Sequence, residues 1–209
     1  MKNKGSILIL SGCAGSGKGT VLKELYNISD RFRYSVSLTT RKPRPGEIDG
    51  VSYHFTTREN FLQRVANGEL CEYTEYCGNL YGTLKSELEE LRNQGYIAIL
   101  EIETDGALQI MKQFPEHRSI FIVPPSYSVL EARLRGRGTE TQAELEKRLA
   151  AAKEEILLSK HYQNLVINFD NRTLQSAEAI KALCLDLPTE GMEAVCRNKE
   201  AFVKAFLEN

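Results

Sequence analysis

The stretch that decides the fold runs from Ile7 to Thr20 and reads ILILSGCAGSGKGT. Its first four residues are apolar and predict a buried parallel strand, and the apolar residues after Thr20 predict a helix. A glycine-rich turn between a strand and a helix points several backbone N–H groups inward. The helix N-terminus and Lys18 add positive charge there. The stretch therefore predicts a phosphate cradle that fits the triphosphate of a nucleotide.

We expect the whole loop to bind the phosphates of a nucleotide. The hydroxyl that usually follows the lysine is displaced by one place, to Thr20, and Gly19 stands between. This spacing resembles that of nucleoside-monophosphate kinases, in which the protein holds magnesium loosely. The alternative is a glycine-rich turn that holds no ligand. The predicted nucleotide-binding residues, which by family resemblance would hold ATP, are Gly12, Cys13, Ala14, Gly15, Ser16, Gly17, Lys18, Gly19 and Thr20.

Composition limits the class of protein. The chain has 209 residues, 42% of them hydrophobic, with a net charge of −1, which suits one sizeable domain and gives nucleic acids or membranes no electrostatic attraction. Five cysteines without a Cys-x-x-Cys pair predict free thiols, and three scattered histidines predict no metal site. The first residues do not resemble a signal peptide, and no apolar run has membrane-spanning length. We expect a cytoplasmic protein.

Apolar strands alternate with helices along the chain. Strands are predicted at 6–11, 96–102, 119–123 and 165–167, with helices between them, which favours an α/β fold with a parallel sheet covered by helices on both faces. Residues 34–38 look extended, and 51–81 predict a small antiparallel insert with a strand at 51–56 and a hairpin turn at 77–79. In the tail, Met192, Val195, Phe202 and Phe206 stand at helical spacing and predict a further helix.

A second group of donors lies between residues 37 and 83. Arg41 and Arg44 can fork onto one phosphate, and the hydroxyls of Tyr53 and Tyr81 can donate to the same group. Because phosphate loops and strand ends share one edge in parallel α/β folds, the insert is well placed to form a second pocket.

The combined motifs resemble the guanylate kinase family. They are the phosphate loop, the string from Ser37 to Glu47 (SLTTRKPRPGE) with the later Gly50 and Tyr53, and the run GRGT at 136–139. The resemblance spans about residues 7–187. It implies a P-loop nucleoside-monophosphate kinase fold, with a guanylate kinase-like domain at 1–187. Within it lie a nucleotide-binding insert at about 37–83 and a helical lid at about 133–148, and a helical extension follows at 188–209.

The resemblance also implies the reaction and the binding residues. The enzyme would transfer the γ-phosphate of ATP to GMP, and to dGMP, giving ADP and GDP in purine nucleotide metabolism, with Mg²⁺ as cofactor. Two carboxylates suit guanine because N1–H and the exocyclic NH₂ are donors, whereas O6 needs a donor such as Ser37 or Thr83. The implied GMP-binding residues are Ser37, Arg41, Arg44, Tyr53, Glu72, Tyr81, Thr83 and Glu103.

No general base is needed, because the accepting phosphate oxygen is already anionic. Positioning and charge neutralisation remain, which suit basic side chains. Arg148 has a plainer interpretation as a surface charge paired with Glu144. By resemblance the catalytic residues are Lys18, Arg41, Arg133, Arg137 and Arg148.

The chain departs from the family pattern at two places. Where the family commonly has Asp-x-Asp-x-Gln-Gly, residues 101–106 read EIETDG, so Glu101 reaches one methylene further toward the metal that it and Thr20 are expected to approach. Near the last strand the family's Asn-Asp is altered around Asn168. Two alternatives stay open: a kinase for another small phosphorylated acceptor, tuned through Glu101, Glu103 and Asp105, or a non-catalytic guanylate-kinase-like module that binds phosphopeptides. The sequence indicates no oligomeric state.

Overall fold

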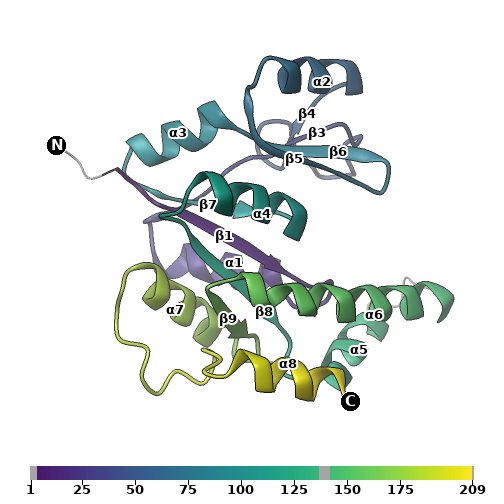
Figure 1. The fold of residues 1–209 in the computed structure, drawn as a ribbon, viewed down its shortest axis with the longest axis vertical. Coiled ribbons are helices and arrows are strands. Elements are labelled where there is room, and N and C mark those ends of the chain that lie inside the picture. Colours follow the sequence, from purple (N-terminus) through teal and green to yellow (C-terminus); the bar gives the residue numbers. More distant parts are fainter. Residues whose placement is uncertain (1–3, 137–141, 209) are drawn as a thin grey trace. The chain divides into compact units, whose positions relative to one another are not determined.

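The computed structural model describes residues 4–136 and 142–208, so that Arg137, Gly138 and Thr139 lie outside the described residues. Five strands form one sheet in the order β2-β7-β1-β8-β9 (Figure 1). Pairs β2–β7 and β8–β9 are parallel. The strands are β1 (Ile7–Gly12), β2 (Phe32–Tyr34), β7 (Ile97–Glu101), β8 (Arg118–Val123) and β9 (Asn164–Ile167).

The predicted apolar strands are the core strands. Ile7, Leu8, Ile9 and Leu10 are fully buried, as expected for a strand covered on both faces. The α/β fold is thus confirmed. The helices are α1 (Lys18–Ile28), α2 (Arg58–Ala66), α3 (Lys85–Asn93), α4 (Thr104–Gln113), α5 (Tyr127–Arg135), α6 (Gln142–Leu157), α7 (Thr173–Cys184) and α8 (Lys199–Leu207), with a 3₁₀ turn at Leu158–His161.

The chain divides into two compact units. One comprises Met1–Ile9 and Arg31–His117, and the other Leu10–Asp30 and Arg118–Asn209, so the division passes through β1. The predicted insert at 37–83 falls within the first unit, and the described parts of the predicted lid, 133–136 and 142–148, fall within the second. The domain boundaries at 187 and 188 stay a prediction.

A second sheet builds the insert, with the strand order β4-β3-β6-β5. Its members are β3 (Leu38–Thr39), β4 (His54–Phe55), β5 (Leu70–Tyr76) and β6 (Asn79–Leu84). Pairs β3–β6 and β5–β6 are antiparallel as predicted. Within the hairpin turn predicted at 77–79, Cys77 and Gly78 both have positive φ, as two-residue hairpin turns require, and Asn79 already belongs to β6.

Two local predictions are wrong, the strand at 51–56 and the helix from Met192. The strand expected at 51–56 is only His54–Phe55, and it pairs parallel with β3. The stretch at 34–38, predicted to be extended, connects the two sheets, since β2 ends at Tyr34 and β3 begins at Leu38. The helix expected from Met192 begins at Lys199.

The tail before α8 covers a sheet edge instead. Val195 forms an antiparallel bridge with Val166 of β9, and Ile167 N donates to Ala194 O over 2.8 Å. Edge strands carry unpaired backbone groups, so an extended partner satisfies them better than a helix. Further on, Phe206 is buried with its ring centroid 6.1 Å from that of Tyr127 in α5.

Candidate functional site

The glycine-rich loop connects β1 to α1 in the second unit. Gly15 and Gly17 have φ near +87° and +85°, a region that L side chains rarely adopt, so glycine is required at both turns. Lys18 begins α1, and its Nζ donates to Gly12 O over 2.5 Å. The lysine therefore folds back across the loop toward the end of β1.

Two side chains from distant segments brace this loop. Asn168 is buried, and its Nδ2 donates to Ser16 O over 2.9 Å. Arg133 at the end of α5 donates from Nη1 to the same carbonyl at 3.3 Å and from Nη2 to Asn168 O at 2.7 Å. Its guanidinium also pairs with Asp170 over 2.6 Å. In this structure Arg133 therefore holds the loop, whereas the sequence assigned it to the transferring phosphate.

A cavity of about 280 Å³ opens beside the braced loop, lined by Gly15, Gly17, Thr20, Arg133, Asn168, Phe169, Asp170, Asn171 and Thr173. Five of these residues follow the end of β9, where the sequence departs from the family pattern. The hydroxyl of Thr20 donates to Gly17 O over 2.7 Å. Cys13 packs in the interior, and burial raises the pKa of its thiol to about 12, so the thiol stays protonated.

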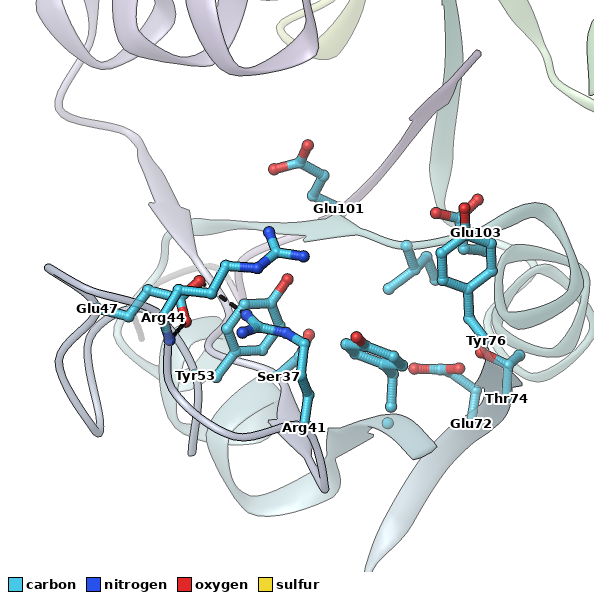
Figure 2. Close-up of a pocket in the computed structure, with 13 residues that line it drawn as sticks. Ser37, Arg41, Arg44, Glu47, Tyr53, Glu72, Thr74, Tyr76, Glu101 and Glu103 are labelled. Atoms are coloured by element: carbon cyan, nitrogen blue, oxygen red, sulfur yellow. Dashed lines mark hydrogen bonds and ion pairs between the residues drawn. The ribbon is translucent and has the colours of Figure 1, made fainter. Parts of the chain in front are cut away.

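A separate cavity of about 250 Å³ lies in the first unit (Figure 2). Seven of the eight predicted GMP-binding residues line it, together with Glu101. The eighth, Thr83, is buried and contacts the lining residue Glu72. Sequence reasoning did not assign Glu47, Thr74, Tyr76, Gly82 and Ile102 to this site. The predicted residues in the lining are Ser37, Arg41, Arg44, Tyr53, Glu72, Tyr81 and Glu103.

The basic end of this cavity is held by Glu47. Its carboxylate accepts from Arg41 Nη2 and from the backbone N of Arg44, both over 2.7 Å. The hydrogen bond from Arg41 holds the pKa of Glu47 below its usual range. The Arg41 guanidinium lies 5.2 Å from the centre of the Tyr53 ring, within cation–π distance. These contacts fix Arg41 before any ligand binds.

The acidic end contains Glu72 and Glu103, drawn opposite the arginines in Figure 2. Only 3% of Glu72 is exposed, and its Oε1 accepts from Thr83 Oγ1 over 2.7 Å. Burial raises the pKa of Glu72 to about 7. Glu103 is exposed and forms the N-cap position of α4. One carboxylate is thus fixed within the wall, and the other stands at a helix start.

Two of the predicted catalytic residues that the structure describes, Lys18 and Arg148, are in neither cavity lining. Arg148 is exposed on α6, and Arg137 lies outside the described residues. Glu47 is the last residue of the string at 37–47 that resembles the family signature. Nothing in that string indicated that its carboxylate would bind Arg41. No sequence signal indicated that Asn168 reaches the phosphate loop.

Within residues 4–136 and 142–208, no three His, Cys, Asp or Glu side chains gather where they could hold a metal ion. Over the same residues, no helix is both long enough and apolar enough to cross a membrane.

The geometry agrees with comparisons to known proteins. The family model described as guanylate kinase matches residues 4–183. A guanylate kinase of Clostridioides difficile (strain 630) is 43% identical over 98% of this chain and 97% of that protein. One of Bacillus anthracis is 48% identical over 86% of this chain and 87% of that protein. The crystal structure of guanylate kinase from Anaplasma phagocytophilum aligns with a TM-score of 0.69 and 31% identity, covering 96% of this chain and 94% of that chain. The chain belongs to the guanylate kinase family.

Proposed function

We propose that this protein transfers the γ-phosphate of ATP to GMP, giving ADP and GDP. The observation that carries the proposal is the polarity of the cavity in Figure 2, with Arg41 and Arg44 at one end and Glu72 and Glu103 at the other. A purine monophosphate has the matching polarity, because its phosphate is anionic and the guanine edge carries N–H donors.

Guanine is selected by the carboxylates. Ionised Glu72 accepts hydrogen bonds from guanine N1–H or the exocyclic amino group, whereas adenine presents a lone pair at N1. Thr83 already donates its one hydroxyl proton to Glu72, which leaves Ser37 in the cavity lining as the donor to guanine O6. These contacts do not involve the ribose 2′ position, so dGMP is also accepted.

ATP is held by the glycine-rich loop. Its inward N–H groups and Lys18 bind the phosphates, and the cavity lined by Phe169 and Asn171 takes the rest of the nucleotide. Transfer requires the two phosphates to come into line, with basic side chains neutralising charge that moves between them. We assign that neutralisation to Arg41, Arg137 and Arg148, with Arg133 joining them once it leaves Asp170.

Mg²⁺ is the cofactor in this proposal. Thr20 and Glu101 offer oxygen atoms, the ligand type that Mg²⁺ prefers, and few protein ligands are needed when substrate phosphates supply the others. Bound Mg²⁺ neutralises phosphate charge. The residues of the chain orient the two nucleotides and exclude water from the transfer.

The test is ADP release measured with GMP, dGMP, AMP and UMP as acceptors, with Lys18→Ala as the control. We expect activity with GMP and dGMP that collapses in the variant. Equal or higher activity with AMP would overturn the guanine assignment. Failure of the wild type to bind ATP would indicate a binding module without catalysis, and transfer to a different phosphorylated acceptor would assign the other kinase function.

A further inference from the structure

Gly106 of α4 touches the carboxylate of Glu72. A Cβ atom built on Gly106 would lie 2.4 Å from Glu72 Oε2 and 3.1 Å from its Cδ. Such distances lie below van der Waals contact, so an alanine here would have to displace the carboxylate. The backbone of Gly106 is helical, so space, not backbone conformation, requires glycine at this position.

The same helix is bonded to the strand that carries Glu72. Gln109 Nε2 donates to Tyr73 O over 3.1 Å, and its Oε1 accepts from Tyr73 N over 3.4 Å. Gln113 Nε2 donates to Cys71 O over 2.6 Å. The two glutamines therefore bind the backbone on both sides of Glu72.

These contacts come from one face of α4. Residues 106, 109 and 113 follow helical spacing, which places them on one side of the helix. β5 is the last strand of its sheet, so its outer backbone groups have no neighbouring strand. The glutamine amides take the place of that strand and fix β5 against α4.

α4 also begins at the second carboxylate of the cavity. Glu103 is its N-cap residue, and Glu103 O accepts from Ala107 N over 2.9 Å. We propose that α4 sets the positions of both carboxylates that contact guanine, and that Gly106 is a positioning residue for Glu72. The proposal rests on the proposed function, in which Glu72 and Glu103 recognise the base.

Gly106→Ala tests the proposal. We expect the KM for GMP to rise about tenfold or more, because the carboxylate moves away from Thr83 and from the base. The KM for ATP and kcat should change less than twofold. Leu108→Ala, on the exposed side of the same helix, is the matched control and should leave all three values unchanged.

A double-mutant cycle with Glu72→Ala separates this effect from general damage. Without the carboxylate the new methyl group meets no clash, so adding Gly106→Ala should change the KM for GMP less than twofold. The cycle has a second readout in thermal unfolding. Alanine favours helices over glycine, so Gly106→Ala should raise Tm in the Glu72→Ala background and lower it in the wild type.

Each outcome addresses one claim. An unchanged KM for GMP in Gly106→Ala, or an equal rise in both backgrounds together with equal Tm shifts, overturns the role of α4. Absence of GMP phosphorylation by the wild type overturns the proposed function instead, and the Tm cycle then still decides whether Gly106 positions Glu72.

Discussion

Arg41 Nη2 and Glu47 Oε1 lie 2.7 Å apart, so the guanidinium that faces the cavity is oriented by a carboxylate six residues away. Both side chains are mostly buried, at 14% and 21% exposure, which limits screening by water. The same carboxylate accepts from Arg44 N, so one side chain fixes the loop from 41 to 47.

Glu47→Ala should therefore weaken GMP binding. Arg41 and the loop lose their shared acceptor, and we expect the KM for GMP to rise about tenfold while the KM for ATP stays constant. Steady-state kinetics with each substrate varied in turn measures both. Glu47→Gln keeps an acceptor oxygen and should show a smaller rise. A lower KM in Glu47→Ala would mean that Glu47 competes with the phosphate.

Burial of Glu72 predicts a pH dependence of GMP use. Its pKa is raised to about 7, and guanine binding requires the ionised form, so kcat/KM for GMP should fall as the pH drops through 7. Activity profiles from about pH 5.5 to about pH 8.5, which bracket that pKa, measure this. Glu72→Gln is the control, because it retains the titration of the GMP phosphate and loses that of the carboxyl group. Identical profiles for the two proteins would contradict the assignment.

The same burial predicts a stability effect of opposite pH dependence. The folded pKa of Glu72 lies above its unfolded value, so the folded protein binds the extra proton and loses stability as the pH rises toward and through 7. The full shift corresponds to about 3 kcal/mol. Urea unfolding at about pH 5 and about pH 8 should show that Glu72→Gln gains stability over the wild type mainly at the higher pH. A constant difference between the two proteins would disprove this.

The brace on the phosphate loop gives a prediction for ATP. Asn168→Ala leaves Ser16 O with one partner fewer, and should raise the KM for ATP several-fold and cost about 1–3 kcal/mol of unfolding free energy. Kinetics and urea unfolding measure the two effects. Asp170→Asn, at an ion pair whose acid is 61% exposed, should change stability far less. Equal destabilisation by both variants would show that the hydrogen bond from Asn168 to Ser16 contributes no more stability than the exposed ion pair of Asp170.

Local signals account for the parts of the fold that the sequence predicts well. The apolar run at Ile7 and the glycines of the loop encode their conformations within a few residues, as does the Cys77-Gly78 turn. Seven of the eight side chains that the family resemblance implies for GMP binding line one cavity.

What could not be predicted depends on contacts between distant residues. Gly106 and Glu72 are 34 positions apart, and Asn168 and Ser16 are 152 apart, so neither pair has a local pattern. The spacing of Met192 and Val195 suits a helix, yet these residues form a turn, in which Val195 N donates to Met192 O, and Val195 is bridged to the open edge of β9. The local preference for a helix is overridden here because the unpaired edge of the sheet offers hydrogen bonds that a helix would not make.

The strip from Ala194 to Cys196 has a consequence for how this protein behaves in concentrated solution. Because Ile167 N and Leu165 O are already hydrogen-bonded to this segment, the edge of β9 has fewer backbone groups available for a strand of another molecule. A protein truncated after Glu193 would expose the edge of β9 to pairing with a strand of another molecule. We therefore expect the truncated protein to form larger oligomers as its concentration rises.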